Sequence, residues 1–176
     1  MANDLGPRLG DSPLSALRNV LDLGLPGVAL EFGVATGRTL RLIAECMPVF
    51  GFDSFEGLPE DWRAGFPAGM FACIEPMVRG AEIVVGRFED TLPGYVWPEK
   101  IGLVHLDADL YSSTRTVLDH LDKHLEVGTV VVFDEWHGYP GCELHEQRAW
   151  REFAERTGWA MDVIGHGPEQ LACRLA

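Results

Sequence analysis

Apolar and polar residues alternate along the chain in a pattern that predicts strands followed by helices. Short apolar runs typical of buried strands occupy residues 27–34, 48–53, 81–88, 100–109 and 128–136. Between and after them, apolar residues recur at helical spacing over residues 11–24, 38–47, 112–125 and 143–157. The run "GTVVVFDEW" is apolar on both faces, which is typical of a strand covered by helices on both sides.

The two ends of the chain add a first helix and a final hairpin. Ser12 is the expected N-cap of the first helix, with Pro13 in its first turn and a stop near Gly24. Residues 159–165 and 170–176 read as an antiparallel hairpin. The prediction is an α/β fold: a Rossmann-like, doubly wound, mostly parallel seven-stranded sheet with a C-terminal antiparallel hairpin and helices on both faces. We expect a single domain over residues 1–176, with an N-terminal helical segment (1–26) and a sheet core (27–176).

Composition narrows the classes of partner. A net charge of −13 argues against a nucleic-acid partner and suits a cationic or metal-bound ligand, or else a solvated acidic surface. No apolar run is long enough to cross a membrane, and a secretory start is not evident, so we expect a cytoplasmic protein. The four cysteines lie far apart and are expected to be free thiols.

Ligands of such sheets bind beyond the carboxyl ends of the strands, where polar residues cluster in this sequence. "EFGVATGR" follows the first strand, with Glu31 where a dinucleotide-binding turn has its first glycine. A carboxylate there repels a pyrophosphate but tolerates a sulfonium or ammonium beside a ribose; a turn that merely needs glycine at Gly33 and Gly37 is the alternative. Asp53 follows at about the 20-residue spacing of a ribose-binding acid, although it could instead cap a turn.

The residues that follow the third, fourth and fifth strands include candidates for stacking on adenine, for binding a cation and for accepting a proton. Phe88 could stack on an adenine, but "EDTLP" could equally begin a helix capped by Asp90 or Thr91. Carboxylates that follow the fourth and fifth strands suit a hard cation such as magnesium, unless one caps a helix or forms an ion pair; they are Asp107, Asp134 and Glu135. Histidines in the last loop are candidate general bases, or else form structural hydrogen bonds; they are His137 and His145.

With these residues in view, the chain resembles the class I S-adenosylmethionine-dependent methyltransferases, and more narrowly the macrocin O-methyltransferase family. The matching phrases are "EFGVATGRTLR", "GFDSFEGLPEDW", "GRFEDTLP", "HLDADLYSSTRTVLDHL" and "VVFDEWHGYPG…HEQRAW". They occur in this order over residues 30–150, which is most of the chain.

The resemblance implies roles by position. Residues of the first turn would bind the methionine part of the cofactor: Glu31, Gly33, Thr36, Gly37 and Arg38. The ribose and adenine would lie at Asp53, Ser54, Phe55, Arg87 and Phe88. Asp107 would contact the cofactor and take the acceptor's proton, with His137 as a second catalytic candidate, and magnesium would lie at Asp107, Asp134 and Glu135. Many relatives have Asp-Asp where this chain has Asp134 and Glu135.

The implied reaction is methyl transfer to a hydroxyl of a small molecule, such as a sugar or a catechol. The chain is shorter than sugar-modifying relatives, and residues 59–76 are its one sizeable irregular stretch and the candidate for a partial lid. Either the acceptor is small or a second subunit completes the site, as in a homodimer. Two other functions stay open: a non-catalytic, cofactor-binding subunit of this fold, and an NAD-dependent oxidoreductase, against which Glu31 argues.

Overall fold

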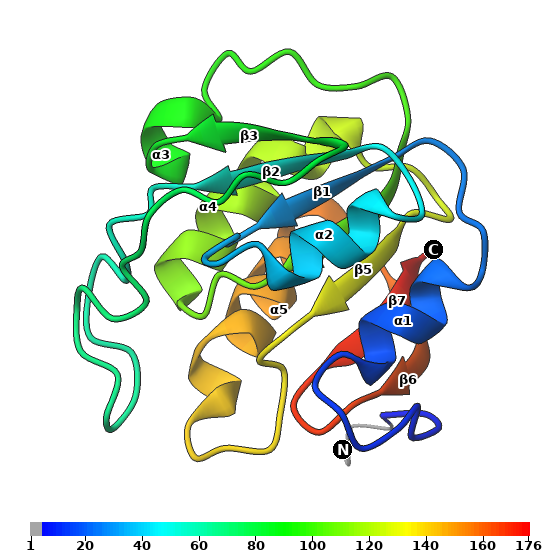
Figure 1. Ribbon diagram of the computed structural model, residues 1–176. Helices are drawn as coiled ribbons and strands as arrows, with labels where there is room; N and C mark the ends of the chain where they lie inside the picture. The colour runs from blue at the N-terminus through cyan, green and yellow to red at the C-terminus, as the bar shows by residue number, and fades with distance from the viewer. Residues whose placement is uncertain (1–4) are drawn as a thin grey trace.

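A computed structural model describes residues 5–176 and contains a seven-stranded sheet in the order β3-β2-β1-β4-β5-β7-β6 (Figure 1). The strands are β1 (Val28–Phe32), β2 (Val49–Asp53), β3 (Ala81–Val85), β4 (Ile101–Leu106), β5 (Val130–Phe133), β6 (Met161–His166) and β7 (Leu171–Leu175). Neighbours among β1 to β5 pair in parallel, while β7 pairs antiparallel with β5 and with β6. The predicted sheet and its C-terminal hairpin are confirmed.

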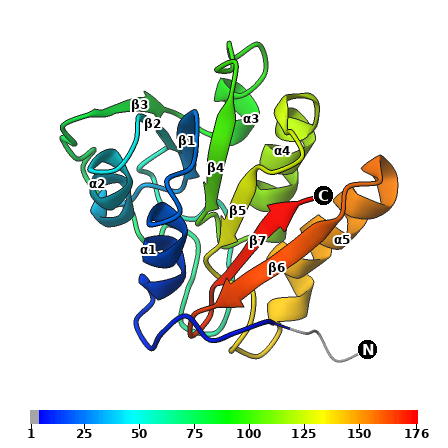
Figure 2. The ribbon, with the colours of Figure 1, turned by 90° about the vertical axis from the view of Figure 1, so that its right-hand side faces the viewer.

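Helices cover both faces of this sheet. They are α1 (Ser15–Leu21), α2 (Arg38–Ala44), α3 (Phe88–Thr91), α4 (Tyr111–Leu121) and α5 (Glu146–Thr157), with short 3-10 helices η1 (Asp122–His124) and η2 (Cys142–Leu144). Figure 2 shows α1 and α2 on one side of the sheet and α3, α4 and α5 on the other. None of the helices within residues 5–176 is long and apolar enough to span a membrane.

Strand β5 shows why both faces must be apolar. Val130 and Val132 pack into the core beneath α1 and α2, whereas Val131 and Phe133 pack into the core beneath α4 and α5. This follows from the alternation of side chains along a strand. The same alternation decides where the polar residues after the strand point.

The N-terminal segment departs from the prediction. Helix α1 begins at Ser15, not Pro13, because Ser12 closes a turn instead of capping the helix: its hydroxyl accepts from the Leu14 N–H at 3.2 Å. Before this turn, Arg8 forms a parallel bridge with His166 on β6. Of the predicted N-terminal helical segment (1–26), residues 1–4 lie outside the described part, and within residues 5–26 the chain is helical over α1 alone.

Two other helix starts also differ. Helix α3 begins at Phe88 directly after Arg87, so neither Asp90 nor Thr91 is its cap. Helix α5 begins at Glu146 rather than near Glu143, because the preceding residues form η2. These shifts matter because Phe88 and Glu146 both belong to the site described below.

The sheet order places the carboxyl ends of β1 and β4 side by side, where the order of connections reverses. In such sheets this reversal is where ligands bind. The irregular residues 59–76, here called the lid segment, lie in the loop between β2 and β3 that extends beyond these strand ends (Figure 1).

Candidate active site

A cavity of about 340 Å³ opens at the carboxyl ends of the parallel strands. The lid segment forms one wall, and the strand ends and the start of α3 form the others. The cavity is lined by seven of the site residues predicted from the sequence: Gly33, Asp53, Ser54, Arg87, Phe88, Asp107 and Glu135. Residues from the ends of β1, β2, β3, β4 and β5 thus meet in one space.

The other predicted cofactor residues lie outside this lining. Glu31 is fully buried beneath it, and Phe55 packs against the core under α1 and α2. Gly37 precedes α2 with a φ of 72°, and a Cβ there would lie 2.9 Å from Val78. The side chains of Thr36 and Arg38 are exposed to solvent.

Asp53 holds the turn that follows β1. Its Oδ2 accepts hydrogen bonds from the N–H groups of Val34 and Ala35, each at 2.8 Å. Its Oδ1 accepts from the Phe55 N–H at 2.8 Å. The carboxylate therefore joins the ends of β1 and β2, and it faces the cavity as well. The turn-capping alternative and a ligand-binding role are compatible, since a carboxylate has about four acceptor positions.

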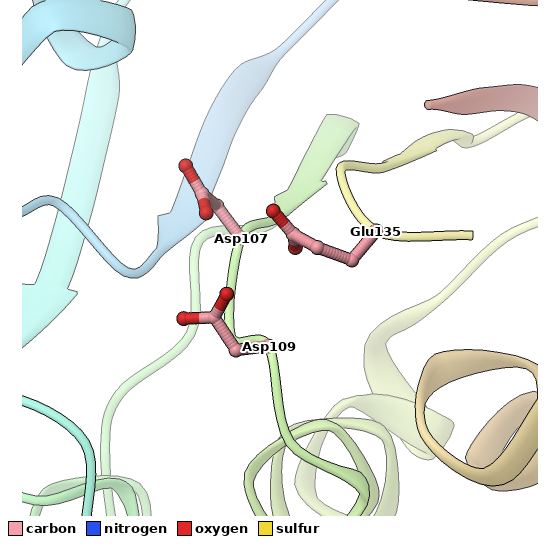
Figure 3. Close-up of side chains that lie close together, drawn as sticks. All are labelled: Asp107, Asp109 and Glu135. Atoms are coloured by element: carbon pink, nitrogen blue, oxygen red, sulfur yellow. The ribbon is translucent and has the colours of Figure 1, made fainter. Parts of the chain in front are cut away.

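Three carboxylates converge beside the end of β4. Oxygen atoms of Asp107, Asp109 and Glu135 all lie within 4.8 Å of one another. Figure 3 shows Glu135 reaching from the loop after β5 toward the two aspartates that follow β4. Asp109 and Glu135 are each only 8% exposed, and Glu135 Oε2 is buried without a hydrogen-bond partner among residues 5–176.

Crowding changes the ionisation of these acids. Burial, and then the charge of Asp134, raise the pKa of Asp107 well above its usual range. Burial, with Asp107 next, does the same to the pKa of Glu135. Burial and the charge of Asp134 raise the pKa of Asp109 to about 7, although Arg63 opposes the shift. The site therefore favours protons or a cation between these oxygens.

Asp134 does not join this cluster. Its Oδ1 lies 3.6 Å from His105 Nε2, and its Oδ2 accepts from Gln170 Nε2 at 3.3 Å. On the other side of the imidazole, His105 Nδ1 lies 2.9 Å from Glu31 Oε1. Burial disfavours the imidazolium, but the carboxylates of Asp134 and Glu31 outweigh this and hold the pKa of His105 well above its ordinary value. The buried His105 thus lies between two carboxylates, one on β1 and one just after β5.

Glu146, at the start of α5, supports the loop that carries Glu135. Its Oε2 accepts from the Glu135 N–H at 3.0 Å, and its side chain is fully buried. Tyr139 donates its hydroxyl to the Glu135 carbonyl oxygen at 3.2 Å. The backbone at Glu135 is therefore fixed from two sides.

An arginine fastens the lid segment over the site. The Arg63 guanidinium carbon lies 4.0 Å from the ring centroid of Trp62 and 4.1 Å from that of Tyr139. Its Nη1 donates to Glu169 Oε2 at 3.3 Å, in the turn between β6 and β7. The lid segment is thereby tied to two distant loops.

The predicted histidines lie away from the reacting groups. His137 is absent from the described lining of the cavity and packs at 5.3 Å, centroid to centroid, against His166. Burial, and then His166, hold the pKa of His137 below its ordinary value. His145 packs edge-on to Trp62, at 6.3 Å between ring centroids. In this geometry the acids, not the histidines, face the cavity.

Comparison with known proteins identifies the family. A family model described as macrocin-O-methyltransferase (TylF) matches residues 69–165, more than half of the chain. The chain belongs to the macrocin-O-methyltransferase family. The resemblance seen in the sequence phrases is confirmed.

Two relatives that match this chain in sequence come from Streptomyces species. The 8-demethyl-8-(2,3-dimethoxy-alpha-L-rhamnosyl)-tetracenomycin-C 4'-O-methyltransferase of Streptomyces olivaceus is 28% identical over 149 residues, covering 68% of this chain and 57% of that protein. The demethyldecarbamoylnovobiocin O-methyltransferase of Streptomyces niveus is 25% identical over 170 residues, covering 79% of this chain and 64% of that protein. The chain thus spans less than two thirds of the length of either relative.

The fold is shared with solved methyltransferases. The structure of the O-methyltransferase NovP superposes with a TM-score of 0.70 at 22% identity, covering 92% of this chain and 77% of that one. The Rossmann-like methyltransferase architecture is therefore confirmed independently of the sequence phrases.

Several residues of the site were not predicted from the sequence. Asp109 stands two residues after Asp107 in "LDADL", and its φ of 57° is unusual for a residue other than glycine. His105 is an ionisable residue inside the apolar run "IGLVHL", a visible signal of a buried polar network. The role of Arg63 could not be read from the sequence, because two of its partners, Tyr139 and Glu169, are distant in sequence.

Proposed function

We propose that this chain is an S-adenosylmethionine-dependent methyltransferase that methylates a hydroxyl of a small molecule, a sugar or a catechol-like compound. The observation that carries the proposal is the shared cavity: the turn after β1, Asp53 and Phe88 lie in the same space as the carboxylate cluster. Membership of the macrocin-O-methyltransferase family supports it, as do the two relatives, which are named as O-methyltransferases of a rhamnosyl-tetracenomycin and of demethyldecarbamoylnovobiocin.

In this proposal the cofactor lies across the ends of β1, β2 and β3. Phe88 and Arg87 flank the adenine, Asp53 and Ser54 bind the ribose, and Gly33 leaves room for the methionine part. Gly37, Thr36, Arg38 and Phe55 would shape the turns behind it. Glu31 would act through His105 rather than by contact, since it is fully buried.

The carboxylate cluster fits a magnesium ion. All its donors are carboxylate oxygens, which hard divalent cations prefer. The buried Glu135 Oε2 that lacks a partner among the described residues is an acceptor that such an ion would satisfy. Asp107, Asp109 and Glu135 would hold the ion, which, when bound, supplies Lewis-acid polarisation of the acceptor's hydroxyl.

The chain's own residues would orient the acceptor and move a proton. Asp107 lines the cavity beside Gly33, so it lies between the proposed cofactor position and the cluster and can take the hydroxyl proton. Trp62, Phe66 and Phe71 of the lid segment form an aromatic wall that restricts water. Holding the acceptor oxygen near the methyl group is the main contribution we assign to the fold.

The test is methyl transfer to a panel of sugars and catechols with magnesium present. We expect Asp107→Asn to lose transfer by about 100-fold or more, as removal of a positioned proton acceptor does. Its affinity for S-adenosylhomocysteine should stay within about threefold of the original, a modest change in binding energy. Asp11→Asn, in an exposed ion pair with Arg8, is the control. An active Asp107→Asn would refute the proton-transfer role, and no turnover with any acceptor would favour a non-catalytic subunit.

We also propose a homodimer, a single domain and a cytoplasmic location. Ile74 and Met77, in and beside the lid segment, are 92% and 95% exposed, which supports cover by a second copy. Sedimentation equilibrium of the chain checks this part: a monomer at all concentrations would refute the dimer.

A further inference from the structure

We infer that Arg63 of the lid segment selects methyl acceptors that carry a carboxylate. The inference rests on the proposed function and deepens it, because it narrows the acceptor from any sugar or catechol to a sugar acid or a catechol acid. It gives Arg63 a second task besides fastening the lid segment. A carboxylate is the group that a planar guanidinium binds best, through two parallel N–H···O bonds.

Arg63 is the positively charged residue at the acceptor end of the cavity. Among the described residues that line this cavity, Arg63 and Arg87 alone carry a positive charge. Arg87 forms an ion pair with Glu56 at 3.0 Å and lies next to Phe88, at the proposed adenine position. Arg63 lies instead near Asp109, since its charge opposes the rise in the pKa of Asp109. An anionic group of the acceptor therefore meets its counter-charge at Arg63.

Most of the N–H donors of Arg63 lack an oxygen partner. A guanidinium has five N–H donors, and within residues 5–176 one of them meets an oxygen, Glu169 Oε2, which lies 3.3 Å from Nη1. The other contacts of the guanidinium carbon are with the rings of Trp62, Phe66 and Tyr139, whose centroids lie at 4.0, 4.9 and 4.1 Å. Nε is buried and has no hydrogen-bond partner among the described residues. Because buried donors in proteins are almost always paired, this one indicates that the guanidinium takes a further partner.

Fastening the lid segment does not by itself account for a charge at this position. The Arg63 side chain is 22% exposed, so its charge is largely removed from water, and its ion pair with Glu169 uses a single N–H. A long apolar side chain would pack on the same three rings without the cost of burying a charge. A ligand that binds the remaining N–H groups explains why an arginine stands here.

The acids nearby limit where a carboxylate of the acceptor can lie. Asp109 and Glu135 line the same cavity and repel a second anion. A carboxylate is therefore stabilised only against Arg63, which fixes the orientation of the acceptor. The hydroxyls of the acceptor are then left to face the carboxylate cluster, as the proposed transfer requires.

The test compares two pairs of probes that differ in one group: protocatechuate with its primary amide, and glucuronate with glucose. Calorimetric titration of the full chain, with S-adenosylhomocysteine and magnesium present, measures their affinities. We expect the carboxylate member of at least one pair to bind about tenfold or more tightly, as charge-assisted hydrogen bonds imply. The ratio of affinities within a pair is the readout, because a loosened lid segment affects both members alike.

Three variants assign this preference to Arg63, and a fourth is the control. Arg63→Gln should abolish the preference, whereas Arg63→Lys, which keeps the charge but loses the planar fork, should keep part of it. Glu169→Gln removes the competing carboxylate and leaves the guanidinium, so the preference should persist or increase. Arg151→Gln alters an exposed arginine of α5 and should leave the ratio unchanged.

Equal affinities within both pairs, absence of acceptor binding included, would overturn the inference. A preference that survives intact in Arg63→Gln would overturn it as well. Circular dichroism checks folding; should Arg63→Gln not fold, Arg63→Lys decides, and its ratio must fall below that of the original chain. Failure of the proposed function is read separately: no binding of S-adenosylhomocysteine refutes that function, whereas its binding without a preference among acceptors refutes only this inference.

Discussion

Gly33 lies directly against the main chain of Asp107: a Cβ built on Gly33 would be 1.8 Å from the Asp107 carbonyl oxygen. No side chain fits at such a distance. The contact fastens the turn after β1 to the residue after β4, at the point where the sheet order reverses. This glycine is therefore required by packing between two parts of the site, whatever ligand the turn receives.

Gly33→Ala should accordingly be among the most damaging single substitutions. We expect it to lower the free energy of unfolding by about 4 kcal/mol or more, because the backbone must shift. Gly128→Ala is a matched control: its φ is 98° against 93° at Gly33, and nothing lies within 4 Å of its added Cβ. That change should cost only ~1–2 kcal/mol, the strain of a positive φ. Urea unfolding measures both, and equal losses would refute the packing argument.

Asp53→Asn should weaken cofactor binding by loosening the turn that Asp53 holds. One amide oxygen cannot accept from Val34 and Ala35 and also from Phe55, so about 1–3 kcal/mol of stability should be lost. We expect a fall of about tenfold or more in affinity for S-adenosylhomocysteine, equal to ~1.4 kcal/mol. Asp61→Asn, which alters one hydrogen bond to the Ala68 N–H, is the control. Matching affinities in the two variants would show that Asp53 plays no part in binding.

Arg63→Met should release the lid segment without unfolding the sheet. The variant keeps an apolar stem but loses the stacking on Trp62 and Tyr139, worth roughly 1–2 kcal/mol. Hydrogen exchange at the Trp62 and Gly69 amides, which bond within the loop, should then accelerate while exchange in β4 does not. Glu169→Gln removes only the partly exposed ion pair, whose side chains are 22% and 34% exposed, and should cost about 0.5 kcal/mol. Unchanged exchange in Arg63→Met would exclude the fastening role.

Stability of the metal-free protein should fall as pH rises from 6.5 to 8.5. The pKa of Asp109 is about 7 in the folded chain and ~3.9 when unfolded, so its contribution is complete at low pH and is lost as pH rises through 7. Asp109 alone accounts for ~0.8 kcal/mol over this window, because most of its contribution is already lost between pH ~3.9 and 6.5. The raised pKa values of Asp107, Glu135 and Glu146 act in the same direction.

Two histidines lower the stability of the fold only at pH values below that window. The lowered pKa values of His137 and His145 reduce stability only below their ordinary range, at more acidic pH. Thermal unfolding across the window measures the effect, and Asp109→Asn should flatten the slope. A free energy of unfolding that is constant or rises toward pH 8.5 would contradict the raised pKa values of these buried acids.

The sequence predicts the sheet well because its strands are short, apolar and separated by helical spacing. It predicts less about which side chains meet, since that depends on strand order and on long loops. Glu31 and His105 are register partners across β1 and β4, a pairing that no local pattern reveals.

The measurement that tests the central claim most directly is calorimetric titration of the chain with S-adenosylhomocysteine in the presence of magnesium. The account predicts binding in the micromolar range, about −8 kcal/mol, and a loss of about tenfold or more in Asp53→Asn. No detectable binding to the original chain would contradict it, and the cavity would then hold a ligand of another class.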